Sequence, residues 1–426
     1  MKNKEITQRK TKILATLGPS SNTIKKIIEL SKAGANAFRL NCSHLDEKSL
    51  KDYVKKIRRA EELLNKPIGI LVDLQGPKIR IGKVKNGENL LKKGSPFLLD
   101  LKEDIGDHKR VKLPHKKIFS SVKKGHLILL DDGKIHLKIT SVKVNEIRTK
   151  VLQGGYLKSN KGVNLPQTNI KTSALSNLDK KFAIMAVQEG VDWIALSFVQ
   201  KPNDIRELRK ICSNKASIMA KIEKPSALDY IDQITNFADG IMIARGDLGV
   251  ELPIESVPGW QKKIIRVARA KGKPVVVSTQ MLESMTSSLT PTRAEVSDVA
   301  NAVFEGADAI MLSAESASGD YPVETVKMMN KIAINIEKDS NYNDILSSQL
   351  EETPDTTPDA IATAAKTLAD ELSSPIIVCY TESGSTGIKV SRVRPSQIIL
   401  TITPIIQTAR KLSLAWGVLS FLQNDE

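Results

Sequence analysis

Eight short apolar runs, separated by stretches of helical pattern, constrain the fold of this chain most strongly. In chain order the runs are Thr11 to Thr16, Asn36 to Asn41, Ile68 to Leu74, Asp192 to Phe198, Ser217 to Ile222, Gly240 to Arg245, Pro274 to Thr279 and Asp308 to Leu312. Most of them are apolar at nearly every position, which is typical of parallel strands buried on both faces. Because amphipathic stretches alternate with them, the sequence predicts an α/β fold, a (β/α)8 TIM barrel with its active site at the carboxyl ends of the strands.

One step between these strands is far too long for a single helix. Most neighbouring runs begin about 23 to 34 residues apart, but the step from Leu74 to Asp192 is more than about 100 residues long. Within it the pattern changes to short β-branched runs with turn residues between them. We therefore expect a small all-β lid domain, inserted after the third strand and closing over the barrel mouth.

The rest of the chain predicts a second, smaller α/β unit. Residues 339–358 are polar and rich in turn formers, which favours a linker, and three further strands alternate with helices after it. The predicted domains are the first part of the barrel at 1–77, the β lid at 78–173, the second part of the barrel at 174–340 and a C-terminal α/β domain at 355–426.

Charge is distributed unevenly along the chain. Residues 1–175 contain 38 basic and 16 acidic residues, whereas residues 176–426 contain 26 and 32. A basic half is compatible with nucleic-acid binding, but the lysines are dispersed, aromatic residues are only 4% and no nucleic-acid motif accompanies them. A solvated basic surface, or one that attracts small anionic substrates, is the favoured interpretation, so no nucleic-acid partner is expected.

Composition also bears on compartment and redox chemistry. No apolar run reaches the roughly 18 residues of a membrane span, and the first residues have no apolar stretch of signal-peptide type. We therefore expect a cytoplasmic protein with no membrane partner. Cys42, Cys212 and Cys379 are too few and too far apart to indicate a disulfide framework or a thiolate metal site.

Two carboxylates lie where neighbouring strands of the predicted barrel end. Glu223 and Asp247 each follow an apolar run and stand 24 positions apart, which is one strand-plus-helix step. Both can point into one pocket and share a hard divalent cation, which takes oxygen ligands and leaves positions open for substrate. Lys221 and Arg245 stand beside them, which favours chemistry on an anion held by a metal. The alternative is a structural network of ion pairs within the barrel.

Further polar residues fall at the same strand ends. They are Arg39, Asn41, Ser43, Asp73, Thr279, Ser313 and Glu315. The chain has no Walker A pattern, so a phosphate would be held by arginine, lysine, metal and a helix N-terminus. Amides of the turn Gly246 to Gly249 could bind a carboxylate, although the same glycines suit an ordinary loop. Thr279 could position a substrate or pass a proton, or it could be structural.

Nine motifs together resemble the pyruvate kinase family. They are Thr11 to Pro19, Arg39 to His44, Asp73 to Arg80, Lys161 to Pro166, Lys221 to Glu223, Ala244 to Gly249, Val277 to Met285, Pro291 to Ala302 and Met311 to Glu315. They span the barrel and the inserted segment in the order of the family, which makes the resemblance specific. It implies a phosphotransferase that moves the phosphoryl group of phosphoenolpyruvate to ADP, giving pyruvate and ATP in the last step of glycolysis.

The resemblance also implies roles for single residues. Glu223 and Asp247 would hold Mg²⁺, or Mn²⁺ in its place, and Lys221 would neutralise charge on the moving phosphoryl group. Arg39 would bind the phosphate, while the amides of Gly246 and Asp247 with Thr279 would bind the substrate carboxylate. The nucleotide contacts would be Asn41, His44, Arg80 and Lys161. Asn41, Ser43, Asp73 and Leu74 resemble the potassium ligands of the family. Protonation of the enolate by a water relay near Thr279 and Ser313 is a hypothesis.

Two departures from the family pattern carry expectations of their own. Lys78 stands where potassium-dependent members have glutamate, so we expect activity without K⁺. The C-terminal domain is shortened relative to the family, which leaves a homo-oligomer open and argues against a tetramer. Thr381 to Gly387 resembles a loop that binds an effector phosphate, although the same residues suit a plain strand-to-helix turn.

Two other classes of protein stay open at this point. A metal-dependent carbon–carbon lyase on a related barrel would share the paired Glu223 and Asp247 but would not need a basic lid with Arg80 and Lys161. A shortened, non-enzymatic basic protein is the other alternative, against which the intact set of catalytic positions argues. The sequence leaves the effector, the oligomeric state and the proton donor to the enolate undetermined.

Overall fold

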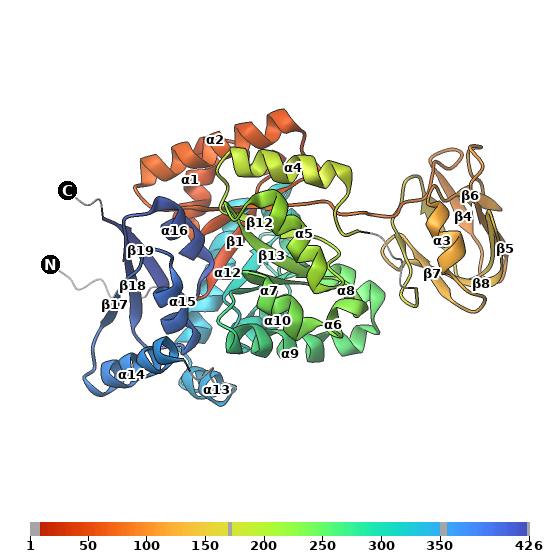
Figure 1. Cartoon of the computed structure of the whole chain (residues 1–426). Coiled ribbons are helices and arrows are strands. Elements are labelled where there is room, and N and C mark those ends of the chain that lie inside the picture. The colour runs from red at the N-terminus through yellow and green to blue at the C-terminus, as the bar shows by residue number, and fades with distance from the viewer. Residues whose placement is uncertain (1–8, 169–172, 350–355, 424–426) are drawn as a thin grey trace.

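The computed structural model describes residues 9–168, 173–349 and 356–423. Three parts follow one another along the molecule in Figure 1: the C-terminal domain at one end, the barrel in the middle and the lid at the other end. The lid stands away from most of the barrel, and residues 74–79, which lead from the barrel into the lid, form neither helix nor strand.

The central part is a closed barrel of parallel strands in the order β1-β16-β15-β14-β13-β12-β3-β2. The strands are β1 Lys12–Thr16, β2 Ala37–Asn41, β3 Gly69–Asp73, β12 Trp193–Leu196, β13 Ser217–Ile222, β14 Gly240–Ala244, β15 Val275–Ser278 and β16 Ala309–Leu312. The longer helices around them are α1 Ile24–Ala33, α2 Glu47–Leu64, α4 Asn177–Gln188, α5 Pro202–Cys212, α9 Val257–Ala270, α10 Arg293–Phe304 and α12 Pro322–Glu337. The predicted TIM barrel is therefore confirmed.

Short helices occupy the loops at both ends of the strands. They are α6 Pro225–Leu228, α7 Ile231–Phe237, α8 Arg245–Glu251, α11 Ala314–Ala317 and the 3-10 turns Pro19–Ser21, Ile254–Ser256, Glu283–Thr286 and Leu412–Leu414. Of these, α8 matters most for the site, because it begins directly after β14 and carries Asp247 in its first turn.

The lid is built around its own apolar core. Its strands are β4 Glu88–Leu91, β5 Pro96–Asp100, β6 Arg110–Lys112, β7 Leu127–Leu130, β8 Ile135–Lys143, β9 Glu146–Gln153, β10 Gly155–Lys158 and β11 Val163–Asn164. They form a six-stranded sheet, β11-β7-β8-β9-β5-β6, and a two-stranded sheet, β10-β4. The expectation of an all-β lid needs one correction, because Lys116–Ser121 forms a short helix, α3, that buries Ile118 and Phe119.

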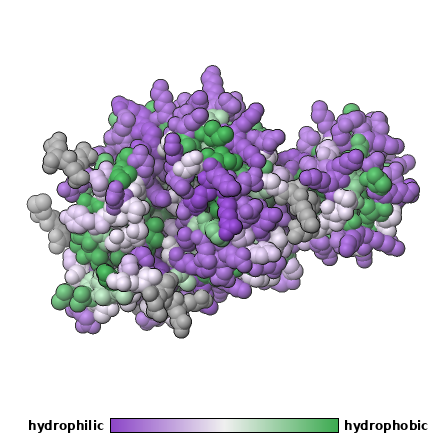
Figure 2. Space-filling model, viewed as in Figure 1, coloured by the Kyte–Doolittle hydropathy of each residue, from purple (hydrophilic) through white to green (hydrophobic). Residues whose placement is uncertain are grey.

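The C-terminal domain is a three-stranded parallel sheet in the order β17-β18-β19. Its elements are α14 Thr357–Glu371, β17 Ile376–Tyr380, α15 Ser385–Arg392, β18 Ile398–Thr403, α16 Ile406–Lys411 and β19 Val418–Leu422. Ile376, Val378 and Tyr380 alternate along the exposed face of β17, and apolar side chains are prominent over this end of the molecule in Figure 2.

The predicted linker at 339–358 is partly wrong. Tyr342–Ser348 forms helix α13, and the side chains of Tyr342 and Leu346 are buried against the barrel core. The sequence looked like a linker because only these two of its apolar residues face the core, which is too few to show helical periodicity. Residues 350–355 of the linker lie outside the described part of the chain.

The C-terminal domain packs on the end of the barrel where the strands begin. Arg410 of α16 forms an ion pair with Glu61 of α2, and Arg394 forms one with Asp308, which directly precedes β16. The Lys12 ammonium donates to the carbonyl oxygen of Val418 at 2.7 Å. The opposite end of the barrel, where the strands finish, is therefore the end that faces the lid.

Candidate active site

The core of the site is a buried cluster of charges at the ends of β2, β3 and β13. The Arg39 Nε donates to Asp73 Oδ2 at 2.7 Å, and the Lys221 ammonium lies 3.1 Å from Asp73 Oδ1. Lys221 also lies 2.8 Å from Glu223 Oε1 and donates to the Ser197 hydroxyl at 2.8 Å. Consecutive strands of a barrel end side by side, so residues scattered over 184 sequence positions meet here.

The cluster holds Lys221 in its charged form. Burial by itself would lower the pKa of the Lys221 ammonium, but Asp73 and Glu223 outweigh that effect and raise it above its usual range. Burial opposes ionisation of Asp73 as well, yet Lys221 and Arg39 together lower the pKa of its carboxyl. A permanently cationic amine at a strand end suits the stabilisation of a developing negative charge.

Glu223 is oriented by the backbone of Phe198. The Phe198 amide donates to Glu223 Oε2 at 2.9 Å, and Phe198 adopts a left-handed φ of 55° to do so. Gly76, with a φ of +70°, makes room for the phenyl ring, since a Cβ at that position would lie 2.5 Å from the Phe198 Cδ2 atom. Backbone strain of this kind occurs where the surroundings fix a conformation for function.

Asp247 completes the predicted carboxylate pair. It lies in the first turn of α8, is half-buried and makes no ion pair with any residue in the described ranges. Burial raises the pKa of Glu223, Lys221 opposes this rise and the charge of Asp247 adds to it, so the two carboxylates repel each other. A divalent cation would relieve that repulsion, and carboxylate oxygens are the donors that Mg²⁺ and Mn²⁺ take. Among the described residues no group of three or more His, Cys, Asp or Glu could hold a metal, so Glu223 and Asp247 form a pair without a third such ligand.

Arg245 does not play the part that its position beside Asp247 suggested. Its guanidinium makes two contacts with the Asp298 carboxylate at 2.6 and 2.7 Å and donates to the Thr279 carbonyl oxygen at 2.6 Å. These bonds support a left-handed turn in which Thr279 has a φ of 72°. The Thr279 hydroxyl in turn accepts from the Gly246 amide at 2.8 Å. Arg245 therefore builds the loop that presents Thr279, and no bond to a substrate is needed to explain its charge.

The residues expected to contact a nucleotide are exposed or half-buried around the mouth. Asn41 accepts a bond from the Ser43 amide at 3.1 Å, and His44 is exposed. In the lid, Arg80 donates to the Asn160 carbonyl oxygen at 3.0 Å and Lys161 pairs with Asp131 at 2.7 Å. No contact within the described ranges joins Arg80 or Lys161 to the charge cluster of Lys221, so the lid and barrel parts of this set lie apart in the structure.

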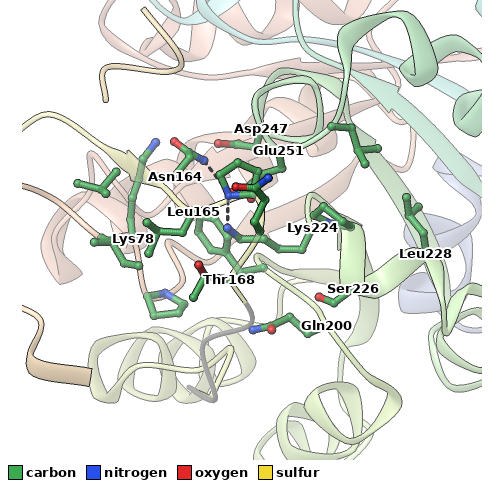
Figure 3. A pocket seen from close by; sticks show the side chains of 18 of the residues that line it. Lys78, Asn164, Leu165, Thr168, Gln200, Lys224, Ser226, Leu228, Asp247 and Glu251 are labelled. Atoms are coloured by element: carbon green, nitrogen blue, oxygen red, sulfur yellow. Dashed lines mark hydrogen bonds and ion pairs between the residues drawn. The ribbon is translucent and has the colours of Figure 1, made fainter. Parts of the chain in front are cut away.

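Lys78 lies in a different part of the site from Asp73, the carboxylate among the residues that resemble potassium ligands. Asp73 uses both carboxylate oxygens on Arg39 and Lys221. Lys78 lies instead along a cavity where the lid meets the barrel, together with Asn164 and Asp247 (Figure 3). We call this junction, formed by residues 77–79 and 163–168, the lid hinge. The cations that neutralise Asp73 in the described part of the chain are therefore Arg39 and Lys221.

Two cavities separate the lid from the strand ends. The larger, about 1280 Å³, is lined by Gly246, Asp247, Thr279 and Ser313 on the barrel side and by Leu129 and His136 on the lid side. The smaller, about 490 Å³, lies at the hinge. Both volumes are adequate for small-molecule substrates. Glu315, another predicted site residue, accepts bonds from the amides of Ser313 and Leu282 and therefore shapes the floor.

The sequence missed three residues of this site. Ser197 and Phe198 end the run before α5, where a serine and an aromatic residue attract no attention, and Asp298 lies 53 positions from its partner Arg245. The only available signal was their place at strand ends or inside a motif. Outside the site, the Thr381 hydroxyl accepts from the Gly384 amide at 2.9 Å, and α15 begins at Ser385. The loop therefore leads from strand to helix, and its resemblance to an effector loop stays a prediction.

Fold and site together define a class before any relative is considered. A TIM barrel with an inserted lid, a carboxylate pair suited to a hard cation and a buried lysine beside it is a barrel enzyme that acts on an anionic substrate. Comparison with known proteins identifies the family within this class. The family models described as "Pyruvate kinase, barrel domain" and "Pyruvate kinase, alpha/beta domain" match residues 8–326 and 359–426. The chain belongs to the pyruvate kinase family.

Individual relatives agree with this assignment. A pyruvate kinase of Methylorubrum extorquens is 50% identical over 417 residues, covering 98% of this chain and 87% of the relative. A pyruvate kinase of Bacillus licheniformis is 42% identical over 96% of this chain and 71% of its own length. The crystal structure of a pyruvate kinase from Cryptosporidium parvum superposes with a TM-score of 0.95 at 34% identity, covering 99% of this chain and 89% of that one. The prediction of a phosphotransferase of this family is confirmed.

Within the described ranges, no helix has the length and apolarity that crossing a bilayer requires.

Proposed function

We propose that this chain transfers the phosphoryl group of phosphoenolpyruvate to ADP with Lys221 beside the moving group. Arg39 binds the phosphate of phosphoenolpyruvate. The amides of Gly246 and Asp247 with the Thr279 hydroxyl bind its carboxylate, which requires the bond between the Gly246 amide and the Thr279 hydroxyl to open. The observation that carries the proposal is the buried ammonium of Lys221, held charged among Asp73, Glu223 and Ser197 at the carboxyl ends of β3 and β13. Phosphoryl transfer depends on such positioning and cationic stabilisation more than on covalent chemistry.

The proposed metal site consists of Glu223 and Asp247. Mg²⁺ bound there, or Mn²⁺ in its place, would supply positive charge to the phosphoryl and carboxylate oxygens of the substrate. The chain itself orients Glu223 through the Phe198 amide and keeps Asp247 free of an ion pair with other described residues. Asp247 lines both cavities, whereas Glu223 is buried and paired with Lys221.

The remaining roles concern the nucleotide and the proton. Asn41 and His44 at the barrel rim and Arg80 and Lys161 in the lid are proposed to bind ADP, which requires the lid to approach the barrel. Thr279 and Ser313 line the same cavity and are placed where a water relay could deliver a proton to the enolate. The nucleotide assignment is supported by the family motifs, and that of the proton relay by the place of Thr279 and Ser313 in the wall of one cavity.

A coupled assay tests the reaction. With phosphoenolpyruvate, ADP and Mg²⁺ and with lactate dehydrogenase as the reporter of pyruvate, we expect turnover that stops when ADP is omitted or EDTA is added. A carbon–carbon lyase would release pyruvate from its own substrate without ADP. Pyruvate formation that is independent of ADP would therefore contradict the proposal.

We further propose that K⁺ is not required. The charge of Asp73, the carboxylate of the potassium-like set Asn41, Ser43, Asp73 and Leu74, is already balanced by Arg39 and Lys221, and Lys78 adds a cation at the hinge. We expect the parent protein to be active in Na⁺-only or K⁺-free buffer. The Lys78→Glu variant should acquire a dependence on K⁺, and a variant with an unchanged potassium-free rate would refute this role of Lys78.

A further inference from the structure

A buried carboxylate at the lid hinge joins three elements of the site. Glu251 is the last residue of α8, and its side chain is only 1% exposed. Its Oε1 atom accepts from the Asn164 amide group at 2.9 Å and forms an ion pair with the Lys224 ammonium. Figure 3 shows these two interactions converging at one wall of the hinge cavity.

Each partner of Glu251 is attached to a part of the proposed metal site or to the lid. Lys224 directly follows Glu223 in the sequence, and Glu251 lies four residues after Asp247, on the same face of α8. Asn164 belongs to β11, the last lid strand before the chain returns to the barrel. The Glu251 carboxylate therefore connects the chain next to both proposed metal ligands with β11 of the lid.

A second path leads from the same lysine to Glu223. The Lys224 ammonium lies 5.5 Å from the centroid of the Phe198 ring. The Phe198 amide is the group that orients Glu223, at 2.9 Å from Oε2. A displacement of Lys224 would therefore move Glu223 in two ways, through the backbone that joins the two residues and through the Phe198 ring, whose residue holds Glu223 with its amide.

General stability does not account for this arrangement. Removing charges from water costs free energy, and a buried ion pair is often no more stable than apolar side chains of the same size. The hinge cavity is lined by apolar groups such as Leu165, Leu252 and Trp260, next to which an apolar side chain at 251 would pack well. A charge in this place is better explained by what it positions.

We propose that Glu251 is a positioning residue that sets the spacing of Glu223 and Asp247. It also makes this spacing depend on the position of lid strand β11. The hydrogen bond from Asn164 couples the position of Glu251 to that of β11. The ion pair with Lys224 couples the position of Glu251 to that of Glu223, which directly precedes Lys224. The inference rests on the proposed function, since it takes Glu223 and Asp247 as the metal ligands. Residues that orient metal ligands typically change metal affinity by about 10- to 100-fold when they are replaced.

Direct Mn²⁺ binding to the substrate-free protein tests this, with free Mn²⁺ measured by electron paramagnetic resonance. We expect Glu251→Gln, which keeps the size of the side chain, to raise the Kd for Mn²⁺ about tenfold or more. The matched control is Glu61→Gln, because Glu61 is also a buried carboxylate that pairs with a cation on another domain, Arg410, but at the far end of the barrel. That control should lower Tm and leave the Kd unchanged.

The result that would overturn the inference is equally direct. If Glu251→Gln binds Mn²⁺ as the parent does while its Tm falls, Glu251 is structural only. If Glu251→Gln does not fold, Asn164→Leu decides, because it removes the lid contact without touching a charge. A raised Kd in Asn164→Leu supports the inference, and an unchanged Kd overturns it.

Failure of the proposed metal site would look different. Glu223→Gln and Asp247→Asn should each abolish or strongly weaken Mn²⁺ binding. If both bind Mn²⁺ as the parent does, the metal site itself is wrong and the inference falls with it. If both lose Mn²⁺ and Glu251→Gln does not, the metal site stands and only the inference fails.

Discussion

At the scale of single residues, roles follow from partners that the sequence does not reveal. The placement of Lys221, Glu223 and Asp247 could be predicted because each lies at the end of a strand, where a barrel gathers its polar groups. The role of Arg245 could not, because Asp298 comes from a different helix and takes up the guanidinium. Glu251 was missed for the same reason: its partners Asn164 and Lys224 lie 87 and 27 positions away.

The loop that presents Thr279 gives the first prediction. Asp298→Asn removes the charge that holds Arg245, so the left-handed turn at Thr279 should loosen and bind the substrate carboxylate less well. We expect KM for phosphoenolpyruvate to rise roughly five- to tenfold, equivalent to about 1 to 1.4 kcal/mol. Steady-state kinetics measures this. Asp52→Asn, which breaks an exposed ion pair on α2, is the control and should leave KM unchanged, and an unchanged KM in Asp298→Asn would refute the role of Arg245.

At the scale of elements, apolar periodicity predicts strands and long helices better than short, isolated ones. All eight barrel strands fall within or beside the apolar runs because each is buried on both faces. The helices α3 and α13 were missed, since each buries only two apolar side chains and so shows no repeat. Strand β1 carries a further feature that no pattern reveals, which is a buried lysine at its first residue.

The second prediction concerns the pH dependence of stability at Lys12. Burial, helped by the charges of Arg9 and Lys66, lowers the pKa of Lys12 from 10.5 to about 7 in the folded protein. Below pH 7 Lys12 is protonated in both the folded and the unfolded state, so the free-energy cost of burying its positive charge is fully present. Between pH 7 and 10.5 the unfolded state binds more protons, so Lys12 contributes a stability that rises with pH by up to about 1.4 kcal/mol per unit.

Urea denaturation at several pH values measures this contribution. We expect Lys12→Met to be more stable than the parent near pH 7, with the difference shrinking as pH rises towards 10, because the buried charge is then relieved in the parent. A difference that does not change with pH would mean that Lys12 stays charged in the folded protein.

At the scale of the whole molecule, the order of domains was predictable but their relative position was not. The lid stands away from most of the barrel (Figure 1), and its position depends on contacts such as that of Asn164 with Glu251 rather than on any pattern in the sequence. The inserted residues 78–172 hold 22 basic and 8 acidic residues, so the positive charge of the chain is concentrated in the lid segment.

The third prediction follows from that charge. Anionic substrates should be attracted to the lid, so kcat/KM for ADP should fall as ionic strength rises from about 0.02 to 0.2 M, because salt screens charges beyond a Debye length of about 10 Å at 0.1 M. Lys138 and Lys150 stand opposite each other on β8 and β9, where like charges repel, and replacing both with Gln should weaken the salt dependence. A kcat/KM that is insensitive to salt in both proteins would contradict electrostatic attraction by the lid.

The central claim is that the buried Lys221 ammonium stabilises the phosphoryl group during its transfer. A single-turnover chemical-quench measurement of ATP formation from phosphoenolpyruvate and ADP tests it most directly, with Lys221→Met compared with the parent and with Lys12→Met, which replaces a buried lysine at the far end of the barrel. We expect the transfer rate of folded Lys221→Met to fall roughly 100- to 1000-fold or more, and that of Lys12→Met to match the parent. Equal transfer rates in Lys221→Met and the parent would contradict the account.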